Sequence, residues 1–336
     1  MIERETLQAS VNGRPVLRRV QIEPTNRCNF TCGYCRRAHW SRPEGDMDLE
    51  RFQEVLSYLP EVPYIHLQGV GEPLLNKDLP AMIRRSRLRG ARVGTTTNAS
   101  MLSKKKAKAL LDSGVNRINL SVDTLEAADF SRLRPGVSME KVLANISALA
   151  ELRHSGGYED VGLTFALVAV PSAIESLCSI ITLAAELGLD EVYLQNLNGS
   201  FLPTDDPVKE SYGDSDYTYY NEATQSAQVL ASRLGIRFLP PAMDVPDYSW
   251  RCRWPLHGCN VTWDGFVSPC CLQPDPDVLH FGNLFETDFE KIWSSPAYHH
   301  FRARVEADCE PLCAKCPDRY GQMWHPTANP FAELQP

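Results

Sequence analysis

The stretch Arg27–Arg37 reads RCNFTCGYCRR and carries three cysteines in the spacing C-x3-C-x2-C, at Cys28, Cys32 and Cys35. Structural zinc sites use four protein ligands, and a [4Fe–4S] cluster held entirely by protein also uses four. A set of three therefore predicts a [4Fe–4S] cluster with one iron open to a small molecule that chelates it. The alternative is a zinc site completed by His39 or by a distant residue.

Outward from this stretch, short apolar runs alternate with amphipathic segments, which is typical of βα units. Six runs predict parallel strands, at residues 18–24, 64–70, 91–98, 117–123, 161–168 and 191–197. Apolar residues with helical spacing lie between them, at Leu49, Phe52, Leu56 and Leu59 and again at Val142, Ile146 and Leu149. Ser103 and Ser138 are predicted N-caps, and Gly114 and Gly188 are predicted to follow helix ends.

This α/β pattern fits an open doubly wound sheet or an incomplete (β/α) barrel, and both place their active-site loops at the C-terminal ends of the strands. Polar motifs follow the first four predicted strands: the cysteine triplet, GVGEP (69–73), TTTNAS (95–100) and SVD (121–123). We therefore expect one functional rim. A helix and an extended strand within residues 220–241 are predicted to lead out of this domain, with a boundary near Val245.

The composition narrows the class of protein. The 336 residues hold 34 Lys and Arg against 42 Asp and Glu, a net charge of −8, which disfavours nucleic-acid and membrane partners. No apolar run approaches the roughly 18 residues of a membrane span, and the N-terminus has no apolar signal region. We expect a cytoplasmic protein, whose 11 cysteines are ligands or reactive groups rather than disulfides.

The cysteine spacing, with Tyr34 directly before Cys35, resembles the signature of the radical S-adenosylmethionine (radical SAM) superfamily, over residues 18 to about 320. The resemblance implies a partial (β/α)6 TIM-like barrel. It also implies that the three cysteines hold three irons of a [4Fe–4S] cluster and that SAM chelates the fourth. Reduction by a flavodoxin or ferredoxin type donor would then cleave SAM to a 5′-deoxyadenosyl radical, which abstracts hydrogen from the substrate.

Further residues match the superfamily's SAM site. GVGEP resembles its GGEP motif, with Val70 in place of the second glycine. The residues that the resemblance assigns to SAM are Tyr34, Gly69, Gly71, Glu72, Pro73, Thr97, Asn98, Ser121, Asp123, Arg134 and Gln195. Among them, Arg134 would reach the SAM carboxylate and Gln195 would face ligand or substrate. The alternative for the strand-end side chains is capping and turn formation.

A second group of seven cysteines lies between residues 252 and 316. Its order resembles SPASM and twitch domains and implies one auxiliary [4Fe–4S] cluster on Cys252, Cys270, Cys313 and Cys316. Cys309 in place of Cys313 is an open alternative, and a zinc ribbon is another. The predicted organisation is an N-terminal extension, a radical SAM core, an auxiliary domain and a tail, at residues 1–17, 18–245, 246–320 and 321–336.

Three cysteines of this group, Cys259, Cys271 and Cys309, are left over and are either hydrogen-atom donors or packed side chains. The expected function is dehydrogenation, epimerisation or decarboxylation of a small polar metabolite such as a sugar, aminocyclitol or nucleoside, with the auxiliary cluster in electron transfer. Radical modification of a ribosomal peptide or protein side chain is the alternative. It is disfavoured because only about 17 residues precede the first strand. An electron carrier is the third hypothesis.

Overall fold

The computed structural model describes residues 10–11, 14–197, 217–240 and 252–314, together with Cys316 and Arg319. The predicted boundary near Val245 and the predicted tail at residues 321–336 lie outside these residues. A short antiparallel pair, β1 (Ser10–Val11) and β2 (Arg14–Pro15), precedes the main sheet. None of the described helices is long and apolar enough to cross a membrane.

The main sheet has nine strands in the order β11-β10-β3-β4-β5-β6-β7-β8-β9. Their bounds are β3 Arg19–Ile22, β4 Tyr64–Leu67, β5 Arg92–Thr97, β6 Arg117–Ser121, β7 Gly162–Val168, β8 Glu191–Gln195, β9 Arg237–Leu239, β10 Gly258–Val261 and β11 Val267–Ser268. All neighbours run parallel except β10 and β11. The six predicted strands, now β3 to β8, are confirmed.

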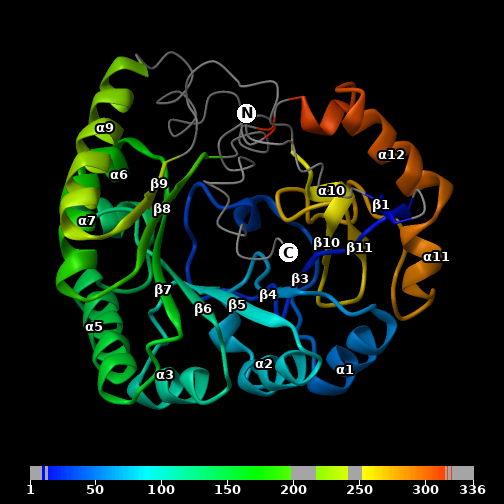
Figure 1. The fold of residues 1–336 in the computed structure, drawn as a ribbon, viewed down its shortest axis with the longest axis horizontal. Helices are drawn as coiled ribbons and strands as arrows, with labels where there is room; N and C mark the ends of the chain where they lie inside the picture. The colour runs from blue at the N-terminus through cyan, green and yellow to red at the C-terminus, as the bar shows by residue number, and fades with distance from the viewer. Residues whose placement is uncertain are drawn as a thin grey trace.

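The helices between the strands cover the outer side of the curved sheet (Figure 1). Those in the ring are α1 Leu49–Tyr58, α2 Leu79–Leu88, α3 Lys104–Leu111, α4 Ala127–Leu133, α5 Met139–Ser155, α6 Pro171–Glu175, α7 Leu177–Glu186 and α9 Tyr217–Leu234. A doubly wound sheet would carry helices on both faces. The arrangement is therefore the partial (β/α) barrel, and the expected fold class is confirmed.

Three strands, β9 at one edge and β10 and β11 at the other, extend the sheet beyond the six. The prediction that the strand after α9 leads out of the domain was wrong, because β9 pairs in parallel with β8. An ion pair of 3.3 Å between Arg237 and Glu191 reinforces this pairing. At the other edge, β10 pairs in parallel with β3, Cys259 opposite Val20. The edge of a sheet offers unpaired backbone groups that any strand can bind, whatever its side chains. Apolar periodicity therefore did not indicate that β9 pairs with β8 or that β10 pairs with β3.

The predicted helix caps are confirmed. The Ser103 side chain accepts a hydrogen bond from the Lys106 amide at the start of α3, and Ser138 accepts one from Lys141 at the start of α5. Gly114 has φ +80° after α3 and Gly188 has φ +67° after α7, values at which a side chain is strained. These caps end the helices where the chain must return to the sheet.

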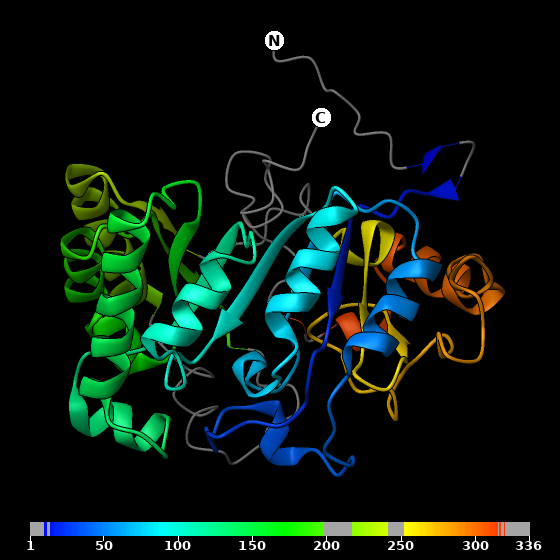
Figure 2. The ribbon, with the colours of Figure 1, turned by 90° about the horizontal axis from the view of Figure 1, so that it is seen from below.

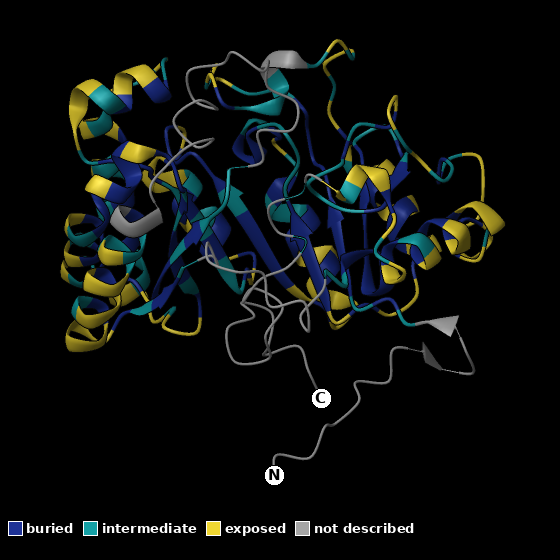
Figure 3. Cartoon of the chain, turned by 90° about the horizontal axis from the view of Figure 1, so that it is seen from above, coloured by how far each residue is buried: buried dark blue, intermediate teal, exposed yellow. Residues whose placement is uncertain are grey.

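The packing separates an apolar layer from a polar interior. Figure 3 shows the strands largely buried and the exposed residues on the outer faces of the helices. On β6, Ile118 and Leu120 are buried among apolar side chains, while the alternate Asn119 and Ser121 line the barrel interior. The interior face of the sheet is therefore available for polar chemistry.

The C-terminal segment packs beside the β10 edge. It contains α10 (Trp254–His257), α11 (Phe289–Trp293) and α12 (Pro296–Glu306). Figure 2 shows α11 and α12, in orange, on the opposite side of the molecule from the green helices. Buried Arg302 donates 2.9 Å and 2.7 Å hydrogen bonds to the carbonyls of Pro255 and Trp293, so α12 is fastened to both neighbouring helices.

Candidate functional site

The loop after β3 carries the cysteine triplet. Cys28, Cys32 and Cys35 are half-buried and all line one cavity of about 280 Å³ at the C-terminal rim. The Cys35 amide donates to the Cys32 carbonyl over 3.0 Å, which closes the loop. Burial raises the pKa of Cys32 to about 12 and also raises that of Cys28. Binding of iron would therefore displace protons from these thiols.

The GVGEP loop packs directly on the cysteine loop. A Cβ atom on Gly69 would collide with the Glu23 side chain, and one on Gly71 would collide with the carbonyl oxygens of Thr25 and Arg27. The Glu72 amide donates a 2.8 Å hydrogen bond to the same Arg27 carbonyl. Glycine is needed at Gly71 because the two backbones are in contact there, and at Gly69 because the buried Glu23 side chain occupies the space of a Cβ atom.

Glu72 joins the ends of two strands. The residue is only 2% exposed, and its carboxylate accepts hydrogen bonds from the Leu74 amide at 3.0 Å, the Thr97 hydroxyl at 2.7 Å and the Asn98 amide at 2.7 Å. Burial raises the pKa of Glu72. The residue borders the cavity, but its carboxylate is directed to protein donors, and its contact with SAM stays a prediction.

Asp123 forms the centre of a buried ion pair. It is fully buried and accepts from Arg134 Nη2 at 2.6 Å, from the Tyr34 hydroxyl and from the Val168 amide at 2.8 Å. Tyr34 lies inside the cysteine loop, so this pair fastens that loop to the ends of β6 and β7. The proposed contacts of Asp123 and Arg134 with SAM stay predictions.

Most residues assigned to SAM surround the triplet. Those that line the cavity are Tyr34, Gly69, Gly71, Glu72, Thr97, Asn98, Ser121, Arg134 and Gln195. Pro73 and Asp123 are not among its lining residues. The Asn98 side chain donates to Asn29 at 3.1 Å and lies 3.9 Å from the Cys28 sulfur. The structure therefore brings the ends of four strands to the cysteine loop.

A second cavity, of about 330 Å³, lies inside the barrel. The four predicted auxiliary ligands all line it, namely Cys252, Cys270, Cys313 and Cys316. Burial raises the pKa values of Cys252 and Cys270 well above the usual range for thiols. In the part of the chain that the structure describes, no three His, Cys, Asp or Glu side chains converge on a single metal-ion position.

The two cavities have a common wall. The residues that line both are Gln68, Gly69, Val70, Thr96, Ser121, Gln195, Cys271, Leu272 and Pro274. Of the three leftover cysteines, only Cys271 borders the cavities; Cys259 is buried on β10 and Cys309 is exposed. A group in the cavity beside the cysteine triplet and a molecule in the barrel cavity would therefore meet along this wall, which includes Cys271.

The polar network of the barrel wall was not predicted. The Tyr64 hydroxyl lies 2.9 Å from Nδ1 of His66, and Nε2 lies 2.9 Å from Gln68 Oε1 and 3.0 Å from Thr96 Oγ1. Asn119 donates to the same Thr96 oxygen over 3.3 Å. Burial lowers the pKa of His66 to about 4, so the ring is neutral at pH 7. Polar residues at every second position of two predicted strands were the available signal.

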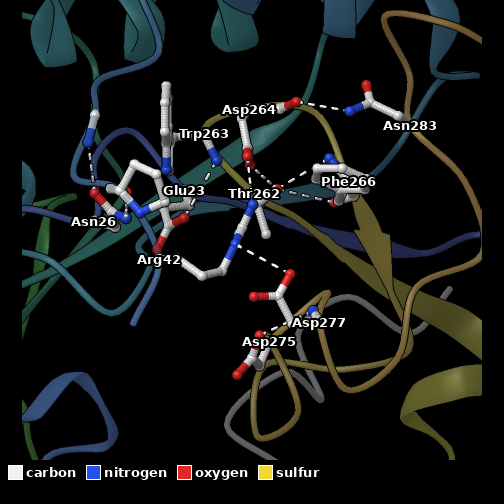
Figure 4. A network of polar contacts seen from close by, with 12 residues as sticks. Glu23, Asn26, Arg42, Thr262, Trp263, Asp264, Phe266, Asp275, Asp277 and Asn283 are labelled. Carbon is white, nitrogen blue, oxygen red and sulfur yellow. Dashed lines mark hydrogen bonds and ion pairs between the residues drawn. The ribbon is translucent and has the colours of Figure 1, made fainter. Parts of the chain in front are cut away.

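A further network connects the turn between β10 and β11 to the loops that follow β3 and β4 (Figure 4). Buried Glu23, at the end of β3, accepts from the Val70 amide at 2.9 Å and from the Trp263 amide at 3.2 Å. Arg42 forms an ion pair with Asp264 in the same hairpin turn. One carboxylate thus joins the GVGEP loop to the turn between β10 and β11, and burial raises the pKa of Glu23 to about 7.

Comparison with known proteins agrees with this geometry. The sequence profile of the Radical SAM superfamily matches residues 22–165, and that of an iron–sulfur cluster-binding domain, SPASM, matches residues 252–317. Among curated relatives, the tungsten-containing aldehyde ferredoxin oxidoreductase cofactor-modifying protein of Pyrococcus furiosus is 26% identical over 88% of this chain and 86% of its own. A probable GTP 3′,8-cyclase of Methanococcus maripaludis is 25% identical over 77% of this chain and 86% of its own.

Among solved structures, Streptococcus suis SuiB bound to S-adenosylmethionine has a TM-score of 0.67 at 16% identity, over 86% of this chain and 68% of its own. SuiB bound to its precursor peptide SuiA has a TM-score of 0.66. At this identity the likeness shows the fold alone. The two profiles, however, span both cysteine groups. The chain is a member of the radical SAM superfamily with a C-terminal SPASM iron–sulfur domain, and SAM and [4Fe–4S] clusters are its cofactors.

Proposed function

We propose that the chain abstracts hydrogen from a small polar metabolite held inside the barrel. When bound, the cluster at Cys28, Cys32 and Cys35 and its SAM supply a 5′-deoxyadenosyl radical. The observation that supports the proposal is the common wall of the two cavities. The cavity beside the cysteine triplet, here called the SAM cavity, directly borders the barrel cavity along this wall. The ends of the strands orient the reactants and keep water away from them.

The walls of the barrel cavity support the substrate class. Its volume of about 330 Å³ is at the small end of ligand sites. Hydrogen-bonding side chains from five strands line it, namely Gln21, His66, Gln68, Thr96, Asn119, Ser121, Tyr193 and Gln195. Such walls suit the hydroxyl groups and ring nitrogens of a sugar, aminocyclitol or nucleoside. The names of the two curated relatives, a cofactor modifier and a probable GTP cyclase, also point to small molecules.

We further infer that Cys252, Cys270, Cys313 and Cys316 hold one auxiliary cluster, which exchanges electrons with the substrate radical. Because this cluster borders the substrate cavity, it suits dehydrogenation, epimerisation or decarboxylation. Cys271 is the leftover cysteine placed to donate a hydrogen atom. A reduced flavodoxin or ferredoxin would supply the external electron. Modification of a peptide side chain is the alternative, and the likeness to SuiB in fold is compatible with it.

The test uses protein reconstituted with iron and sulfide without oxygen. About eight iron atoms per chain are expected, which corresponds to two four-iron clusters, and reduction should convert SAM to 5′-deoxyadenosine. The variant Cys28→Ala/Cys32→Ala/Cys35→Ala should hold about four iron atoms per chain and cleave no SAM. Candidate substrates carrying deuterium, small molecules and peptides alike, should be screened for deuterium in 5′-deoxyadenosine. SAM cleavage by the triple variant, or transfer from peptides alone, would overturn the proposal.

A further inference from the structure

Arg36 connects the two cysteine groups. It directly follows Cys35 and begins the short 3-10 helix η1 (Arg36–His39). Its Nη2 donates a 2.9 Å hydrogen bond to the carbonyl of Leu272, a residue 236 positions further along the chain. Leu272 stands two residues after Cys270, a predicted auxiliary ligand. One side chain therefore links the loop of the SAM cluster to the loop of the auxiliary cluster.

The surroundings of Arg36 place a positive charge between the two groups. Burial lowers the pKa of Arg36, whereas its electrostatic interactions with Cys270, Asp275, Cys35 and Cys316 raise it. These belong to both ends of the chain. Arg36 also lines the SAM cavity beside Cys271 and Leu272. A guanidinium keeps its charge in such a site because its pKa is far above neutrality.

Arg37 provides a natural contrast within the same helix. Its Nε donates over 3.0 Å to the Asn26 carbonyl, and its guanidinium pairs with Glu44. Both partners lie in the N-terminal loops rather than in the C-terminal hairpin. Two adjacent arginines thus carry the same charge but are directed to different parts of the molecule.

We propose that Arg36 is a positioning residue that holds the Cys270 loop against the Cys35 loop and raises the reduction potential of the auxiliary cluster. The proposal rests on the proposed function, because it requires a cluster at Cys252, Cys270, Cys313 and Cys316. A nearby cation stabilises the more negative, reduced state of a cluster. The potential is thereby suited to accept an electron from a substrate radical.

In a dehydrogenation, the electron count would balance with SAM as the oxidant once an external donor has supplied the first electron. The substrate radical left by hydrogen abstraction would lose one proton to solvent and one electron to a cluster held by Cys252, Cys270, Cys313 and Cys316. That electron would then be available to reduce the cluster at Cys28, Cys32 and Cys35 for the next turnover. Arg36 would act on this step through its charge and through its hydrogen bond to Leu272, which holds the two cysteine loops together.

The experiment measures the auxiliary cluster alone, in the reconstituted Cys28→Ala/Cys32→Ala/Cys35→Ala chain, by potentiometric titration followed by electron paramagnetic resonance. Arg36→Gln should change the ratio of reduced to oxidised cluster about tenfold at a fixed potential, which lowers the midpoint by about 59 mV for one electron. Arg36→Lys keeps the charge and should recover most of the shift, and Arg37→Gln should leave the midpoint unchanged.

Two results would overturn the role of Arg36: an unchanged midpoint in Arg36→Gln, or equal shifts in Arg36→Gln and Arg37→Gln. Failure of the proposed function is distinguishable. If the triple-alanine chain with native Arg36 holds no iron, the auxiliary cluster itself is absent, whereas a full complement of about four irons with an unshifted potential refutes Arg36 alone. Arg36→Lys keeps the test decisive should Arg36→Gln lose its cluster.

Discussion

Replacing Asp123 by asparagine should destabilise the whole rim of the barrel. Asp123 is 0% exposed and its partner Arg134 is 7% exposed, so the substitution leaves a guanidinium buried without its counter-charge. Removal of one partner from a buried ion pair costs about 3–5 kcal/mol. The new amide group would also face the donors of Arg134 and Tyr34. With an unfolding entropy of about 2.1 cal/mol/K per residue, this corresponds to a fall in Tm of about 4–7 °C.

The assay is thermal unfolding of the apoprotein followed by circular dichroism, with iron content after reconstitution as a second readout. The matched control is Asp129→Asn, which breaks the ion pair with Arg132 on the exposed side of the same region. Exposed pairs contribute about 0–1 kcal/mol, so this Tm should move by less than about 2 °C. Of the two variants, only Asp123→Asn should lose iron, because the hydrogen bond from Tyr34 to Asp123 anchors the cysteine loop. Equal Tm values for the two variants would show that the Asp123–Arg134 pair contributes no more to stability than an exposed ion pair.

Three other perturbations test the site. Gly71→Ala should weaken SAM binding at least tenfold, about 1.4 kcal/mol, because its Cβ would collide with the cysteine loop. The Cβ of the control Gly33→Ala meets no atom within 4 Å, so this variant should bind SAM normally in equilibrium dialysis. Equal affinities would contradict the close packing at Gly71. The pKa of Glu23 is raised from 4.5 to about 7 by burial, so the folded chain retains a proton that the unfolded chain releases, and the free energy of unfolding should fall as pH rises through this window. Glu23→Gln should remove that slope in denaturant titrations; an unchanged slope would exclude Glu23 as its source. Cys271→Ser should keep its iron and its SAM cleavage, yet slow substrate conversion at least tenfold in product analysis. The control Cys178→Ser, on the outer helix α7, should convert substrate at the native rate. Equal rates for the two variants would exclude Cys271 from the reaction.

Much of the fold could be predicted because its signals are local. The apolar runs that became β3 to β8, and the caps at Ser103 and Ser138, are readable within a few residues. The pairing of β9 with β8 and of β10 with β3 could not be predicted in this way. Backbone hydrogen bonds join these strands to the sheet, and such bonds leave no periodic pattern in the sequence. The same holds for His66, whose partners Tyr64 and Thr96 meet only when β4 and β5 pair.

The residues that suggest the chemistry of the rim can be read from the sequence alone: three cysteines within eight positions and the glycines of GVGEP. The second cysteine group likewise indicates an iron–sulfur domain after the barrel. How these parts face one another depends on the tertiary structure. It set Glu72 and Asp123 among protein donors, singled out Cys271 at the wall between two cavities, and joined Arg36 to Leu272 across 236 positions. Spacing and periodicity reflect contacts between residues that are near in the sequence, whereas these contacts join distant residues and form only when the strands assemble into the partial barrel.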